Sequence, residues 1–131
     1  MKKEFVLTQK SYFYRKLIRP IKHFYQKLTQ GFSDKDTWSL DYTICKLTLP
    51  RLKRFREICN DYYPGVPATL AEQFPNDDKV HDEWINILDK IIYAMEKHID
   101  DEYLWIGNKD ERKKIEEGFK LFHEYFFALW W

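Results

Sequence analysis

The chain has 131 residues, of which 33% are charged and 18% are aromatic, and its formal net charge is +1. This length suits one ordinary domain, and the supply of apolar side chains argues against a disordered chain. No run approaches 18 apolar residues and the stretch after Met1 is too short for a signal peptide, so we expect neither a membrane span nor export.

The small net charge hides an asymmetry between the two halves of the chain. Residues 1–60 carry 14 Lys and Arg against 5 Asp and Glu, whereas residues 61–131 carry 8 against 16. Two interpretations are open. The halves attract each other on folding or share one evenly charged surface, or the first half presents a basic face to an anionic partner.

The first predicted helix covers residues 11–29. Its apolar residues fall on one side at helical spacing: Phe13, Leu17, Ile21, Phe24, Tyr25 and Leu28. The opposite side has no acidic residue and consists of Arg15, Lys16, Arg19, Lys22, His23, Gln26 and Lys27. We expect Pro20 to break or kink this helix and Gly31 to end it.

The second predicted helix covers residues 34–60, with Ser33 as its N-cap. Apolar residues form two neighbouring stripes, which together favour a central, mostly buried helix: Trp38, Tyr42, Cys45, Leu49 and Leu52, and beside them Leu40, Ile44, Leu47, Phe55 and Ile58. Pro50 is expected to kink or restart it.

Cys45 and Cys59 are the only cysteines. On one helix, 14 steps of ~1.5 Å place them about 21 Å apart, too far for a disulfide or a shared metal ion. The sequence therefore predicts two buried thiols in a reducing compartment.

Two further helices are predicted after an irregular stretch at residues 61–79, which is long enough to hold a short helical turn or a functional loop. They cover residues 80–99 and 110–131, each with one apolar face. No segment shows the alternation typical of a strand. The predicted fold is a single all-α domain over residues 1–131, either a four-helix bundle or an irregular orthogonal helical domain.

Asp41 lies in the sequence Trp-Ser-Leu-Asp, inside the apolar arc of the second helix. A buried carboxylate needs a partner or it becomes protonated. We therefore expect Asp41 to be buried, either as a structural ion pair or helix cap, or as a ligand-binding carboxylate or general base.

Enzyme and metal signatures are missing from the sequence. His81 and His98 fall on or near an apolar face, but the spacing of di-iron bundles and the His-Glu-x-x-His motif are absent. A glycine-rich phosphate loop and a Gly-x-Ser-x-Gly elbow are absent as well. We expect no metal, no cofactor and no enzymatic activity.

The basic side of the first helix is the best candidate for a binding site. It could be plain solvated surface, it could lie on an anionic membrane, or it could bind nucleic acid or nucleotides through cations and stacked aromatic rings. The candidate ligand-binding residues are Arg15, Lys16, Arg19, Lys22, Tyr12 and Asp41.

The last predicted helix carries aromatic side chains outside its inward apolar stripe, which consists of Ile115, Phe119, Phe122, Phe126 and Leu129. Phe127, Trp130 and Trp131 fall off or beside that stripe, and no polar tail follows them in the sequence. Either the second helix or the 61–79 loop covers these rings, or they form a contact surface for a homodimer or a partner protein.

Three stretches together carry a resemblance: Gly31–Asp41, which contains Trp-Ser-Leu-Asp, Trp84–Ile92, and Glu117–Trp131, which contains Tyr-Phe-Phe-Ala-Leu-Trp-Trp. The chain resembles a group of small uncharacterised proteins of tailed bacteriophages and prophages, over most of residues 15–131. The resemblance implies a source and no mechanism: a protein in the cytoplasm of an infected bacterial host.

The sequence thus favours a non-enzymatic phage accessory protein that acts by binding. Its target would be a host defence or regulatory protein, or an anionic nucleotide that it sequesters. One alternative is a structural or virion-assembly component. A third class is an enzyme that uses Asp41 or the histidines.

Overall fold

A computed structural model of the chain describes residues 12–62, 64–74, 77–100 and 107–131. The described residues are helical and contain no strand, which confirms the all-α prediction. Contacts divide the chain into two compact units, an N-terminal unit (Met1–Thr43) and a C-terminal unit (Ile44–Trp131). The single domain predicted from the sequence stays a prediction.

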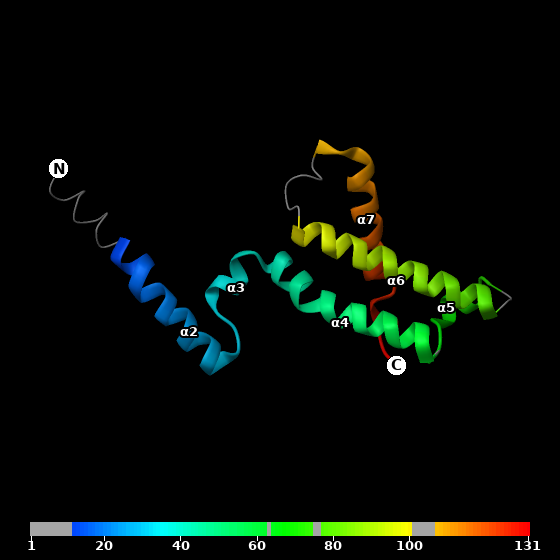
Figure 1. The fold of residues 1–131 in the computed structure, drawn as a ribbon, viewed down its shortest axis with the longest axis horizontal. Helices are drawn as coiled ribbons and strands as arrows, with labels where there is room; N and C mark the ends of the chain where they lie inside the picture. The colour runs from blue at the N-terminus through cyan, green and yellow to red at the C-terminus, as the bar shows by residue number, and fades with distance from the viewer. Residues whose placement is uncertain (1–11, 63, 75–76, 101–106) are drawn as a thin grey trace. The chain divides into compact units, whose positions relative to one another are not determined.

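The described part of the N-terminal unit contains a continuous helical rod. A π-helical stretch, η1 (Tyr14–Ile18), leads directly into α2 (Arg19–Gln30), drawn in blue in Figure 1. Pro20 is the second residue of α2, and because the rod is continuous the helix must accommodate the N–H that proline lacks. The wider π-helical turn immediately before Pro20 accommodates the proline without breaking the helix at the position predicted from the sequence.

The predicted second helix is two helices, because the backbone leaves the helical region at Ser39 (φ −117°, ψ 73°). The first is α3 (Asp34–Trp38) and the second is α4 (Leu40–Tyr62). The Asp36 carbonyl accepts a hydrogen bond from the Thr43 hydroxyl at 2.8 Å. This side-chain bond satisfies a carbonyl at the end of α3 while α4 begins.

Pro50 does not restart the helix, since α4 runs through it. Proline lacks a backbone N–H donor. A side chain stabilises the neighbouring turn, because the Arg51 guanidinium donates to the Leu47 carbonyl at 2.5 Å. Both thiols of α4 are buried as predicted, Cys45 at 3% and Cys59 at 2% exposure.

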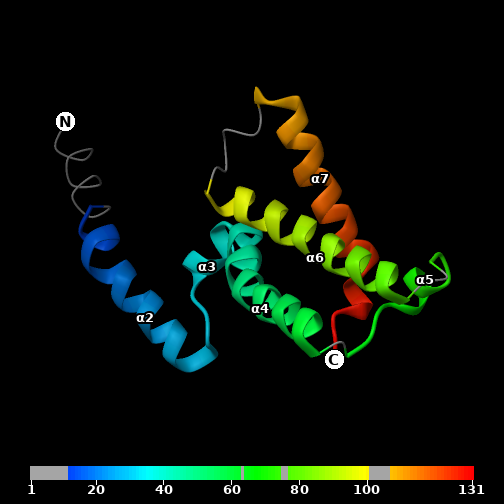
Figure 2. The same ribbon diagram turned by 45° about the vertical axis from the view of Figure 1, so that its right-hand side comes forward.

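In the C-terminal unit, α5 (Ala68–Ala71) is the short helical turn allowed for in the 61–79 stretch, and α6 (Asp77–Asp100) follows it. The central helix is α6, which lies between α4 and α7 (Lys109–Glu124) in Figures 1 and 2. Its buried residues dominate the core: Val80, Trp84, Ile85, Ile87, Leu88, Ile91, Ala94 and Met95.

The prediction that the second helix is the central one is therefore wrong. In α4 only Cys45, Leu52 and Cys59 are buried, because its two apolar stripes are not both covered in the described structure. Helix α6 is the central one instead, because it packs against both α4 and α7.

The helices of the C-terminal unit are joined by ring contacts and ion pairs. Trp84 of α6 packs edge-on against Phe55 of α4, with ring centroids 6.4 Å apart. The Arg56 guanidinium of α4 binds both carboxylate oxygens of Asp89 of α6, at 2.8 and 3.1 Å. A two-pronged Arg–carboxylate contact fixes orientation more strongly than a single-bond pair.

The last helix is shorter than predicted. Helix α7 begins at the N-cap Asn108, whose side chain accepts hydrogen bonds from the backbone of Asp110 and Glu111, and it ends at Glu124. A 3-10 turn, η3 (Phe126–Ala128), follows it. Tyr125 makes the bend and its ring packs on Trp84, with centroids 5.5 Å apart. This contact anchors the bend to the core of the C-terminal unit.

Candidate functional site

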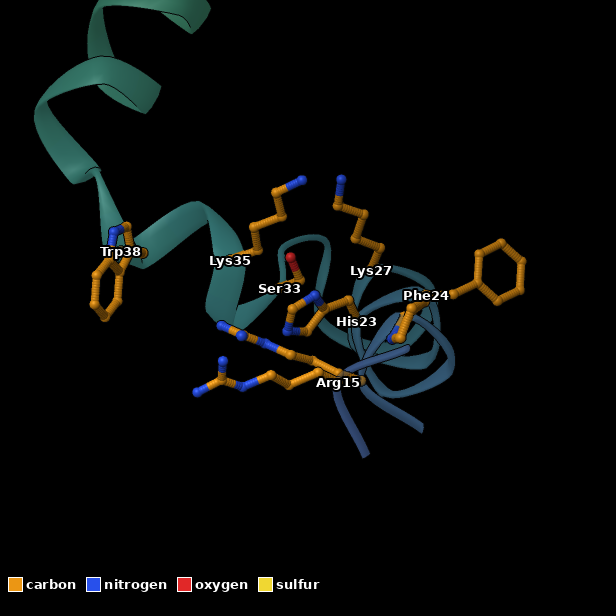
Figure 3. A pocket seen from close by; sticks show the side chains of 9 residues that line it. Arg15, His23, Phe24, Lys27, Ser33, Lys35 and Trp38 are labelled. Atoms are coloured by element: carbon orange, nitrogen blue, oxygen red, sulfur yellow. The ribbon is translucent and has the colours of Figure 1, made fainter. Parts of the chain in front are cut away.

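The N-terminal unit contains an open groove of about 910 Å³ beside α2 and α3. Its lining residues are Arg15, Arg19, Pro20, His23, Phe24, Lys27, Ser33, Lys35 and Trp38. In Figure 3, Lys27 from α2 and Lys35 from α3 extend in the same direction, while the Phe24 ring points away from the cationic side chains. The lining therefore combines cations with one indole.

A tight turn brings α3 back beside α2. Gly31 adopts a left-handed conformation (φ 84°) that favours glycine, and its N–H donates to the Lys27 carbonyl at 3.1 Å. Ser33 is completely buried. Its backbone N–H and its hydroxyl both donate to the Asp36 carboxylate, at 2.9 and 3.1 Å. The turn and the N-terminal cap of α3 thus fix the two sides of the groove.

Polar contacts between α2 and α3 hold the hairpin together. The Asp34 N–H donates to the Gln26 side-chain oxygen at 2.9 Å, and the Lys22 ammonium lies 3.2 Å from the Asp34 carboxylate. Hydrogen bonding to Gln26, and then to Lys22, lowers the pKa of Asp34. The backbone N–H of Ser33 is the main cause of the lowered pKa of Asp36. Both carboxylates are therefore ionised and engaged at neutral pH.

The groove itself has an excess of positive charge. Among the ion pairs of the described residues in this unit, the nearest acid to a cation of the groove lining is Asp36. Its carboxylate is 4.0 Å from the Lys27 ammonium. None of the residues that line the groove is acidic. Such a surface attracts anions, and its attraction weakens as salt is added.

Trp38 gives the groove an aromatic component, because its side chain is 85% exposed although tryptophan is usually buried. The expectation that Trp38 belongs to a core stripe is thus wrong for this residue. An exposed indole beside arginine and lysine can stack on a planar ring while the cations contact phosphate oxygens.

The candidate residues named from the sequence divide into two groups. Arg15 and Arg19 line the groove. Lys22 is paired with Asp34 instead, and Lys16 contacts Tyr12, donating to its hydroxyl at 3.0 Å with the ammonium 5.4 Å from the ring centroid. The structure therefore brings two of the six candidates together and places the other four, Asp41 among them, outside the lining.

Asp41 does not occupy the position predicted for it. It is exposed in the first turn of α4 and is not among the groove residues. The prediction of a buried carboxylate fails because the interruption at Ser39 changes the helical phase that placed Asp41 in an apolar arc. A carboxylate in a first helical turn is favoured by the helix dipole without burial.

Lys35 and Trp38 were not candidates, and His23 and Lys27 were noted only as part of a polar side. The two α3 residues reach the groove because Gly31 reverses the chain. The stop signal at Gly31 and the cap at Ser33 were both readable in the sequence, and together they could have indicated a hairpin.

A second feature lies in the C-terminal unit, where aromatic side chains stay exposed after α7. Phe127 is 90% exposed, Trp130 76% and Trp131 73%. Both tryptophans line two open grooves, of about 940 and 420 Å³. Arg51 and Arg54 contribute to the larger one. The helix and loop considered as covers thus form grooves beside these rings without burying them.

Other chemistry is sparse in the part of the chain that the structure describes. His81 is buried in α6, and His98 packs edge-on against Phe119, with centroids 5.7 Å apart. No three His, Cys, Asp or Glu side chains among the described residues gather as metal ligands would. None of the described helices is long and apolar enough to cross a bilayer.

The groove of the N-terminal unit is accordingly the best-defined candidate site. Comparison of the chain with protein-family models, with curated proteins and with solved structures gives no match, so the site is interpreted from its own residues.

Proposed function

We propose that this protein acts by binding, and that the groove of the N-terminal unit takes the phosphate groups and one base of a nucleotide or a single-stranded nucleic acid. The observation that supports this is the joining of five basic side chains to an exposed tryptophan in one groove: Arg15, Arg19, His23, Lys27 and Lys35 with Trp38. The role is sequestration or recognition, without a catalytic step.

The cationic side chains and the tryptophan would bind different parts of the ligand. Guanidinium groups present paired donors that match phosphate oxygens, and lysines add mobile point charges. Stacking of a base on an aromatic ring contributes about 1–3 kcal/mol in single-strand binding. A groove of about 910 Å³ is within the range of small-ligand sites.

The test uses the full chain with two probes, a fluorescent oligothymidylate and ATP. We expect binding that weakens steeply with salt and that is lost in Arg15→Glu/Arg19→Glu. The matched control is Lys113→Glu/Lys114→Glu, which makes the same change in net charge at two exposed residues of α7. Binding of neither probe, or equal losses in the two variants, would disprove the proposal.

The stacking component has its own comparison. Trp38→Ala should weaken oligothymidylate binding by about tenfold, and Trp38→Phe should retain most of it. If alanine and phenylalanine behave alike, the groove binds phosphate only and the base lies elsewhere.

The biological setting follows from the resemblance to small phage proteins and remains a proposal. In that setting the protein is an accessory factor in the cytoplasm of an infected bacterium, directed at a host defence or regulatory system that depends on nucleotides or nucleic acid. The alternatives are a virion component, which would be found in purified particles, and an enzyme using Asp41. The exposed position of Asp41 outside the groove gives the enzyme no support.

A second binding surface is favoured by the exposure of Phe127, Trp130 and Trp131. Large contiguous aromatic surfaces on a protein usually mark contacts. We propose that this aromatic surface joins two copies of the chain or receives a partner protein. Light scattering separates the two occupants.

A further inference from the structure

Within the described part of the N-terminal unit, nothing covers the apolar side of η1 and α2. Its side chains are 44–70% exposed: Phe13, Tyr14, Leu17, Ile18, Ile21, Phe24, Tyr25 and Leu28. No residue of η1 or α2 is buried. The rod formed by residues 14–30 is roughly 25 Å long at ~1.5 Å per residue. Single apolar residues are normal on protein surfaces, but the continuous apolar surface of this rod is larger and marks a contact site.

The charge on the rest of this rod is of one sign. Between Tyr12 and Ser33 the sequence has no Asp or Glu, whereas it has five Lys and Arg and one His. At 100° per residue along α2, Lys22 and Lys27 fall on the two edges of the apolar side, and Arg19 falls opposite it. Lysines in such edge positions can bend toward an interface while their stems stay in apolar surroundings.

We infer that the apolar side of η1 and α2 lies on the surface of an anionic phospholipid bilayer, with its aromatic and aliphatic side chains among the upper acyl chains. The pattern is that of an interfacial helix: one apolar side rich in aromatic rings, cations along both edges, and no acid to repel the headgroups. A protein groove would not require the complete exclusion of acidic residues from the helix.

This surface meets the groove of the proposed function at Phe24 and Lys27, but its Ile21 and Leu28 lie outside the groove lining. The groove cation Arg19 occupies the arc opposite the apolar side, and the Phe24 ring points away from the cationic groups in Figure 3. The pairing of Lys22 with Asp34 at 3.2 Å joins two half-exposed side chains, and such pairs are weak. Lys22 can therefore turn toward headgroup phosphates at little cost.

The experiment is sedimentation of the full chain with large vesicles, either phosphatidylcholine alone or phosphatidylcholine mixed with phosphatidylglycerol. We expect binding to the mixed vesicles and little binding to the neutral ones. Ile21→Gln/Leu28→Gln should lower the partition by about tenfold or more, because two apolar side chains no longer enter the bilayer. Lys22→Gln, at an edge position outside the groove lining, should reduce the preference for anionic lipid.

The matched control is Ile44→Gln/Leu47→Gln, which changes two exposed apolar residues of α4 and should leave the partition unchanged. Circular dichroism melts of each variant check that the chain still folds. The inference is overturned if the wild type stays in the supernatant with both vesicles, or if Ile21→Gln/Leu28→Gln and the control bind alike. It is also overturned if Ile21→Gln/Leu28→Gln lowers the melting temperature of a chain that binds no vesicle, which would assign this side to packing.

The oligothymidylate assay on the same variants separates this inference from the proposed function. Ile21→Gln/Leu28→Gln should bind the oligonucleotide like the wild type while losing vesicles. If Arg15→Glu/Arg19→Glu abolishes vesicle binding and Ile21→Gln/Leu28→Gln does not, the lipid contact is made by the groove and the inference is wrong.

Discussion

Gly118 of α7 lies against the backbone of Lys90 in α6, so closely that a Cβ atom at position 118 would stand 2.5 Å from the Lys90 carbonyl oxygen and 2.4 Å from the Ala94 Cβ. The absence of a side chain therefore allows the two helices to approach. The Lys90 ammonium and the Glu117 carboxylate, 2.9 Å apart, reinforce the same crossing from the surface.

Gly118→Ala should therefore destabilise the protein, although alanine is the better helix former. The methyl group forces the helices apart, and overpacking of this kind costs about 1–3 kcal/mol. Urea unfolding followed by circular dichroism measures the loss. Gly107→Ala is the control, because a Cβ there meets no atom within 4 Å. A Gly118→Ala variant as stable as the wild type would show that the crossing is looser than described.

The Asp36 carboxylate should titrate below its ordinary value of 3.8, because the Ser33 N–H donates to it. A lowered pKa means that this bond stabilises the fold above pH 3.8 and that the contribution is lost as the pH falls through the folded-state value. The amide resonance of Ser33 in nitrogen–proton NMR spectra reports it. The resonance should shift with a midpoint below 3.8 in the wild type and should not shift in Asp36→Asn.

The Cys59 thiol should react slowly with a disulfide reagent in the native state and rapidly in urea. Burial raises its pKa above the ordinary 9.0, so the reactive thiolate is scarce. A raised pKa also means that the unfolded chain loses this proton first, so stability falls as the pH rises past 9.0. The fall should be smaller in Cys59→Ala. Equal pH dependence in the two chains would show that the thiol contributes nothing.

The aromatic surface of Phe127, Trp130 and Trp131 should control self-association. If it joins two copies, light scattering finds a dimer, and Phe127→Ser/Trp131→Ser gives a well-folded monomer. Since Phe127 is 90% exposed, the variant should lose little stability as a monomer. A monomeric wild type whose melting temperature drops in the variant would mean that these rings are covered by the chain itself.

Single-faced helices were predictable from the sequence. Trp84, Leu88, Ile91 and Met95 repeat at helical spacing and all are buried in α6. The boundaries at Gly31 and Ser33 follow from the conformations those residues prefer. The burial of the two cysteines was predictable because a free cysteine behaves as a small apolar residue, and Cys45 also lies within an apolar stripe.

The phase of the second helix was not predictable, and the errors at Trp38 and Asp41 have this common cause. One residue, Ser39, leaves the helical region, and every face assigned across it shifts. Serine is only a mild helix breaker, and the bond from Thr43 to the Asp36 carbonyl that accompanies the break spans seven residues. The groove was hidden for the same reason, since Lys35 and Trp38 were assigned to a longer helix.

The N-terminal unit has one tryptophan, and that residue lines the groove. Trp38 is the sole tryptophan of the N-terminal unit and is 85% exposed, whereas Trp84 is 1% exposed in the core of the C-terminal unit. An exposed indole emits at longer wavelength than a buried one and is open to collisional quenching by iodide. Iodide should therefore quench Trp38 together with the exposed Trp130 and Trp131 and leave the emission of Trp84 untouched. A Trp38→Phe difference spectrum would then isolate the indole of the groove. The binding of unlabelled ligands could then be followed through the fluorescence of Trp38.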